Sequence, residues 1–166
     1  FARAADGTLK DADVRQEQLE RLLDDPRARW SARRFAEQWL EITLVAQLPK
    51  TEEALTDAHR AAMSAEAIDY VTDALVSGAP FSALFDTTTR VMTPALASFY
   101  DLPAPTELDA DGRGPVDVAG TPYEAGVLTL GAVLMSHAFP GGSSPVHRGA
   151  LVRERMLCQE LTPPPP

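Results

Sequence analysis

The sequence predicts an all-α fold, an irregular multi-helix bundle of about five to seven helices with a long central loop. Apolar residues recur at three- and four-residue spacing in several segments, and residues that favour helix caps stand where those segments begin. We find no internal repeat and no succession of alternating apolar and polar runs, which would indicate strands. We therefore expect helices joined by loops, with at most a minor β pairing in the middle.

The first part of the chain predicts two consecutive helices. Residues 11–25 carry an apolar stripe formed by Val14, Leu19, Leu22 and Leu23. Asp25 and Pro26 then suit the N-cap and first turn of a second helix over residues 26–46. Its buried face is expected to consist of Trp30, Phe35, Trp39, Leu40 and Ile42.

Residues 56–76 form the clearest predicted helix. Its regular apolar stripe consists of Met63, Ala67, Tyr70, Val71, Ala74 and Leu75. Gly78 stands where a C-terminal cap belongs. A short helical turn over residues 81–85 and a short helix that starts at Thr93 and ends near Tyr100 follow.

The last third begins with a loop over residues 101–122, which is rich in Pro, Gly and Asp. We expect a hydrophobic helix over residues 124–137 and an amphipathic helix over residues 144–160. Ser144 is the predicted N-cap of this last helix, and Cys158 is expected to be buried on it. The chain ends in a proline run with the tendency of polyproline II.

Composition excludes several classes of protein. The 166 residues carry a formal net charge of −9, whereas nucleic acid or an anionic membrane surface would require a basic face. The chain has a single cysteine, so it has no internal disulfide and no multi-cysteine zinc site. Its longest apolar stretch is about five residues short of the roughly 20 that span a bilayer. We therefore expect no nucleic-acid partner and no membrane-spanning helix.

Two charged clusters leave alternatives open. Arg27, Arg29, Arg33 and Arg34 form a dense basic patch, which predicts either an anion site near a helix start or arginines that bridge to acidic residues. An acidic loop resembles a degenerate calcium-binding loop, with candidate ligands Glu107, Asp109, Asp111 and Asp117. Val118 stands where the bidentate glutamate of such a loop belongs, so a solvated Asp-Gly turn is the alternative.

Sequence motifs for catalysis are weak. His59, His137 and His147 could form a metal site with Cys158 only if the fold collects them, because no two histidines have i, i+4 spacing. Ser144 and His147 are close in sequence, but a helix cap explains Ser144 more simply than a nucleophile does. The sequence contains no phosphate-binding loop and no zinc-protease motif. We therefore expect no catalytic residue in this chain.

Several segments resemble a known group of proteins. They are the D-P-R-A-R…F-A-E-Q-W-L segment (residues 25–40), L-T-D-A-H-R-A-A-M-S-A-E (residues 55–66), S-P-V-H-R-G (residues 144–149), R-E-R-x-L-C (residues 153–158) and the proline run. Together they resemble exported proteins of planctomycetes and myxobacteria that carry domains of unknown function 1592 and 1588. The chain departs at Thr93, where an asparagine is usual in such proteins, although both residues cap helices.

The resemblance implies a domain organisation. Residues 1–102 would form a helical domain like domain 1592, residues 103–122 a linker, and residues 123–166 the start of domain 1588 with a proline-rich tail. A C-x-x-C-H motif for haem c typically follows the proline run in such proteins. Haem c would therefore belong to the full-length parent, and no cofactor is expected on this chain, whose one cysteine cannot supply that motif.

The resemblance also suggests a function. The chain would be a non-catalytic scaffold or docking domain of a larger cytochrome c-like protein in the periplasm or on the outer surface. Its partner would be a protein or a neighbouring haem module, contacted by Arg148 with His147, Ser144 and Gly149. Two alternatives are an accessory subunit of an electron-transfer complex and part of a redox enzyme whose reacting centre lies outside this chain.

Overall fold

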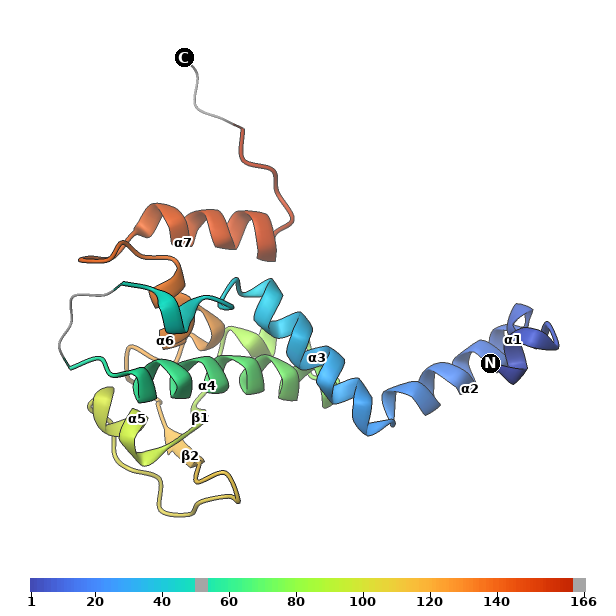
Figure 1. The fold of residues 1–166 in the computed structure, drawn as a ribbon, viewed down its shortest axis with the longest axis horizontal. Coiled ribbons are helices and arrows are strands. Elements are labelled where there is room, and N and C mark those ends of the chain that lie inside the picture. The colour runs from blue at the N-terminus through green and yellow to red at the C-terminus, as the bar shows by residue number, and fades with distance from the viewer. Residues whose placement is uncertain (50–53, 163–166) are drawn as a thin grey trace.

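The computed structural model describes residues 1–49 and 54–162. Within these residues the chain is mainly helical, with seven α-helices (Figure 1). They are α1 (Ala2–Ala5), α2 (Ala12–Leu23), α3 (Pro26–Trp39), α4 (Asp57–Val76), α5 (Pro94–Phe99), α6 (Gly131–Ser136) and α7 (Pro145–Leu151). The last helix continues as a π-helical stretch, Val152–Met156. Short 3₁₀ turns occupy Thr8–Lys10, Val45–Gln47, Phe81–Leu84 and Gly126–Thr129.

A small sheet makes the expected all-α fold approximate, and its place in the middle of the chain agrees with the minor β pairing that the sequence allowed. Strands β1 (Thr89–Met92) and β2 (Gly114–Asp117) pair antiparallel, with Thr89 opposite Asp117 and Met92 opposite Gly114. Strand β2 lies inside the segment that the sequence predicts to be a loop. Each strand has only four residues, and the two are separated by α5, so no local pattern in the sequence reveals their pairing.

Helix α4 is the central element, as its apolar stripe predicts. Thr56 caps it, because its side-chain oxygen accepts a hydrogen bond from the backbone N–H of His59, while His59 Nδ1 accepts one from the Thr56 N–H. Gly78 follows the helix with φ +68°, as expected for a C-terminal cap. Helices α3, α5 and α6 and strand β1 all contact α4.

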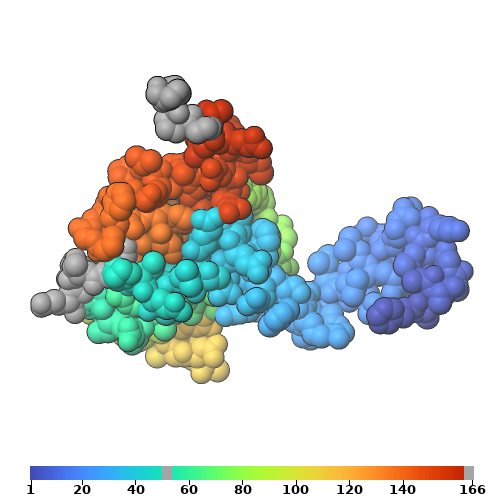
Figure 2. Space-filling view, turned by 45° about the horizontal axis from the view of Figure 1, so that its top comes forward, coloured from blue at the N-terminus to red at the C-terminus, as the bar shows by residue number. Residues whose placement is uncertain are grey.

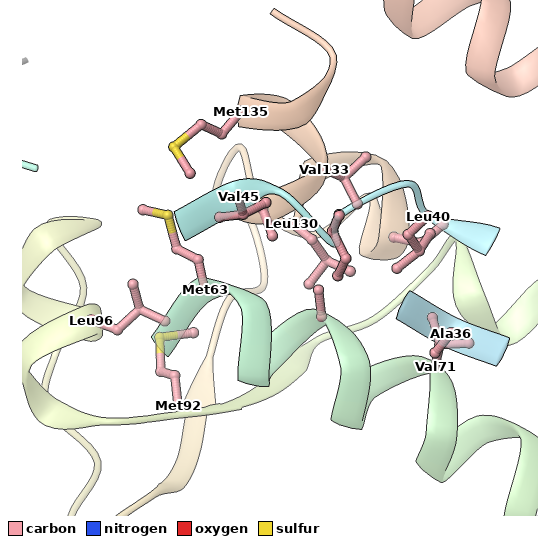
Figure 3. Packing of buried hydrophobic residues seen from close by; sticks show 14 of the residues in the cluster. Ala36, Leu40, Val45, Met63, Val71, Met92, Leu96, Leu130, Val133 and Met135 are labelled. Atoms are coloured by element: carbon pink, nitrogen blue, oxygen red, sulfur yellow. The ribbon is translucent and has the colours of Figure 1, made fainter. Parts of the chain in front are cut away.

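One hydrophobic core joins the early and late parts of the chain. Leu40 and Val45 lie beside Leu130 and Val133, on the side of α4 that carries Met63 (Figure 3). The cluster of buried apolar residues runs from Ala36 to Met156 and includes residues from the sheet and from α7. The segments expected as a domain, a linker and a second helical segment therefore share one core.

Residues 1–25 form an arm that projects from the rest of the molecule (Figures 1 and 2). Helix α2 begins as predicted, because Asp11 accepts hydrogen bonds from the N–H groups of Asp13 and Val14. No residue of α1 or α2 is buried, however. The expected stripe of α2 is therefore exposed to solvent instead of packed on a core.

Helix α3 differs from its prediction in length and in its buried face. Trp30 and Phe35 are 66% and 50% exposed, so their expected burial is wrong. The helix ends at Trp39, not near residue 46, and Glu41 adopts φ +56°. Residues two apart on a helix lie about 200° apart. In a continuous helix, Leu40 and Ile42 would therefore point in nearly opposite directions. The end of the helix at Trp39 allows both side chains to enter the same core.

Two later helices are also shorter than predicted. The segment 124–137 is divided at Leu130, whose backbone is extended, and the backbone of Gly126 (φ +55°) lies directly against the Leu84 carbonyl. The last helix ends at Met156, and Cys158 has φ +51°. Cys158 is exposed, so its expected burial is also wrong. None of the helices in the described part of the chain combines the length and hydrophobicity that crossing a bilayer would require.

Candidate functional site

The turn before α7 is organised by Ser144. Its buried side-chain oxygen accepts a hydrogen bond from the N–H of His147 at 3.3 Å, and Pro145 is the first helical residue. The predicted cap is therefore confirmed. The imidazole of His147 lies against the ring of Phe139, with 5.0 Å between centroids. This turn fixes the position from which α7 presents Arg148.

Arg148 has no carboxylate partner among the described residues. Its Nη1 donates a hydrogen bond of 2.7 Å to Ser143 Oγ, a neighbour in sequence. Gly149 is exposed, and a Cβ atom there would meet nothing within 4 Å. The charge of Arg148 and the space at Gly149 are thus available to another molecule.

A groove of about 580 Å³ opens beside Arg148. We call it the aromatic groove, because Phe99, Tyr100, Tyr123 and Phe139 contribute to its walls. Leu134 and Met135 of α6 add apolar surface, and the glycine-rich turn before α7 forms one side. Its lining residues include one charged side chain, that of Arg148. The groove therefore offers an apolar surface with a cation at its edge.

A buried ion pair lies behind the aromatic groove, and the sequence analysis missed it. Arg90 Nη2 lies 2.6 Å from Glu66 Oε1, and the two side chains are 0% and 2% exposed. The Arg90 guanidinium lies beside the adjacent rings of Tyr100 and Tyr123, at 5.7 and 5.8 Å from their centroids, which are 4.9 Å apart. Tyr100 also donates a hydrogen bond to Glu66 Oε2 at 3.3 Å. The same tyrosines thus contact the buried charges and line the groove.

Burial dominates the electrostatics of this pair. It raises the pKa of Glu66 to about 7, although Arg90 and the Tyr100 hydroxyl both act to lower it. The pKa of Tyr100 is raised too, chiefly by burial and then by the Glu66 charge. Glu66 could have been found in the sequence, since it stands three residues after Met63 and four before Tyr70, on the apolar stripe of the central helix.

A polar cavity of about 530 Å³ also borders the pair, since Glu66 and Arg90 are among its lining residues. Asp69 of α4 forms ion pairs there with Arg33 of α3 and with Arg113, which also contacts Asp111 at 2.9 Å. Arg29 reaches Asp73 at 2.6 Å. The lining charges are thus paired with one another, and these contacts hold α3 and the acidic loop against α4.

The arginines of the basic patch form ion pairs with carboxylates, which agrees with the second of the two interpretations given for the patch. Besides the contacts of Arg29 and Arg33, Arg27 pairs with Asp25 at 2.6 Å, and Arg34 lies 3.6 Å from Glu37. Arg34 also lies over the ring of Trp30. Each of the four arginines of the patch therefore has an acidic partner.

The acidic loop uses its carboxylates to build a turn. Asp109 Oδ1 accepts hydrogen bonds of 2.9 Å from the N–H groups of Asp111 and Arg113. Asp117 accepts one of 2.9 Å from the Ala119 N–H. The four candidate calcium ligands, which include Glu107, therefore do not form a metal site. Within residues 1–49 and 54–162, no three His, Cys, Asp or Glu side chains form a group that could hold a metal ion.

The histidines are also dispersed. His59 belongs to the cap of α4, His137 is buried with Nε2 at 3.2 Å from the Leu40 carbonyl oxygen, and His147 lies on α7. Covalent haem does not fit this chain, since it requires two cysteines and only the exposed Cys158 is present.

Comparison with known families agrees with the resemblance in the motifs. Residues 1–102 match PSD4, a protein of unknown function (DUF1592), and residues 124–166 match PSCyt3, a protein of unknown function (DUF1588). No curated protein and no solved structure matches the chain. The chain therefore belongs to the PSD4 (DUF1592) family and carries a C-terminal segment that matches PSCyt3 (DUF1588).

Proposed function

We propose that this chain is a non-catalytic docking domain of a larger, exported, cytochrome c-like protein. In this proposal the aromatic groove receives a neighbouring haem module of the same polypeptide, and Arg148 pairs with a carboxylate of that module. The name PSCyt3 and the resemblance of residues 144–166 to segments that precede a haem motif support this assignment.

One observation carries the proposal. Arg148 stands at the rim of an apolar groove of about 580 Å³ without a carboxylate among the described residues. An arginine at such an edge favours a planar carboxylate, which it can bind through two N–H donors. The surrounding apolar walls would exclude water from that contact and strengthen it.

Tethering would favour this occupant over an unrelated protein. The groove lies beside the first turns of α7, and the chain continues through the π-helical stretch Val152–Met156 before it runs toward its C-terminal end (Figure 1). A module joined through a short proline-rich linker would meet this face at a high effective concentration. Even a weak contact would then hold the module in place.

The test uses the chain and the haem module of its parent as separate proteins, so that tethering does not hide the affinity. The dissociation constant is measured by titration calorimetry. Arg148→Ala should weaken binding by about tenfold or more, as loss of a charged hydrogen-bonded contact does. Phe139→Ala should also weaken it, because it removes part of the groove wall.

Matched variants separate this site from general effects. Arg21→Ala removes an exposed arginine of the arm and should leave binding unchanged. No binding by the unmodified chain would overturn the proposal, as would equal affinities for all variants. A parent without the absorption spectrum of haem would also overturn it, whereas catalytic turnover at its haem would favour the redox-enzyme alternative.

A further inference from the structure

Two arginines of the globular part differ from all the others that the structure describes there. Within residues 1–49 and 54–162, Arg148 and Arg153 have no carboxylate within 4.0 Å; Arg148 bonds to Ser143 and Arg153 to Gln159. Every other described arginine outside the arm has an acidic partner at that distance. These paired residues are Arg27, Arg29, Arg33, Arg34, Arg60, Arg90, Arg113 and Arg155.

Both unpaired arginines line the same groove, which is distinct from the aromatic groove. This arginine groove has a volume of about 470 Å³, and none of the described residues that line it is acidic. Its apolar surface consists of Leu128, Val133, Leu151 and Val152. Gly149 lies between the two arginines along the helix, and the open space there lets a backbone come close. The groove thus fits an apolar segment that carries carboxylates.

The chain itself contains such a segment in α2. Leu19, Leu22 and Leu23 are 50%, 53% and 64% exposed, and they share one sector of about 100° on the helix. Glu20 borders this sector, and Asp24 follows the helix on the same flank. An isolated helix of 12 residues is marginal in water, so α2 needs an apolar surface to cover its leucines.

We propose that α2 of one copy packs into the arginine groove of a second copy. The leucines of α2 would cover the apolar floor of the groove, and Glu20 and Asp24 would face Arg148 and Arg153. Charge complementarity favours this occupant, because Glu20 and Asp24 are acidic and these two arginines lack acidic partners among the described residues. If both copies exchange their arms, the contact occurs twice about a twofold axis. This dimer goes beyond the docking of a haem module, and because both grooves include Arg148, the two partners would compete for that side chain.

The experiment measures the oligomeric state of the chain of residues 1–166 by sedimentation velocity over a range of concentrations. The unmodified chain should form dimers. Leu22→Glu, Glu20→Arg and Arg153→Glu should each raise the dimer dissociation constant by about tenfold or more, since each removes apolar contact or places like charges together. The double variant Glu20→Arg with Arg153→Glu should recover the dimer, because the charges are exchanged across the same contact.

Leu108→Glu is the matched control, because it changes an exposed leucine outside both the arm and the groove and should leave the dimer intact. A chain that remains monomeric at high concentration would overturn the proposal. So would a dimer that withstands Leu22→Glu and Arg153→Glu, or a double variant no better than its parents. Haem-module binding is measured through Phe139→Ala, which lies outside the arginine groove, so the two proposals can fail separately.

Discussion

Glu66 provides a direct test of the buried ion pair, because its carboxyl group titrates differently in the folded and unfolded chain. Burial raises its pKa from 4.5 to about 7 in the folded protein. Between these values the folded state holds a proton that the unfolded state has released. The free energy of unfolding therefore falls as pH rises through this window, and the Glu66 contribution to that loss is about 3 kcal/mol.

Glu66→Gln removes this titration while it keeps the size of the side chain. Between about pH 4 and about pH 8, the wild-type chain should lose about 3 kcal/mol of stability relative to the variant. Urea unfolding at several pH values, followed by circular dichroism, measures both curves. The difference between the two curves removes the contribution that other groups titrating in the same range make to the free energy of unfolding.

Glu154→Gln is the control, since it removes an exposed carboxylate that has no ion pair among the described residues. Its curve should run parallel to that of the wild type. If the curve of Glu66→Gln is parallel to the wild type as well, burial does not govern the Glu66 carboxyl group, and our account of the pair is refuted.

Three further substitutions test the packing. Tyr70→Ala should cost about 2 kcal/mol in urea unfolding, less than a fully buried aromatic residue, because the ring is half-buried. Ser144→Ala should cost about 1 kcal/mol through loss of the cap, and a thermal melt without any shift would contradict its role. Gly114→Ala should cost about 2 kcal/mol, because the new methyl group would collide with the Glu107 carbonyl oxygen. Gly149→Ala faces open space, and a comparable loss there would contradict the argument for Gly114.

Features determined by local chemistry could be predicted from the sequence. The caps at Asp25, Thr93 and Ser144 all lie where the sequence places them. Each depends on one side chain and a backbone N–H group two or three residues away. Helix α4 was predictable because its stripe is long and regular. The position of Arg148 on the first turns of α7 followed from the cap at Ser144.

Features determined by distant parts of the chain could not be predicted in this way. Strand β1 is recognisable only beside β2, and Arg90 enters the core because Glu66 of a different element compensates its charge. The break at Leu130 follows an approach of Gly126 to Leu84 that no local pattern contains. Exposure of Leu19 and Trp30 likewise depends on what the rest of the fold leaves uncovered. The aromatic groove is similar, because its walls come from four separate stretches of chain.

The shared core has a consequence for how this protein can be divided. Neither of the two segments that match known families, residues 1–102 and 124–166, contains enough of the apolar cluster to close it alone. A cut in the exposed loop that precedes β2 would therefore yield two complementing fragments instead of two autonomous modules. Removing the shorter fragment would uncover α4, and the longer one would then expose the surface that Leu130 and Val133 normally cover. The two segments are accordingly expected to fold stably only when both are present.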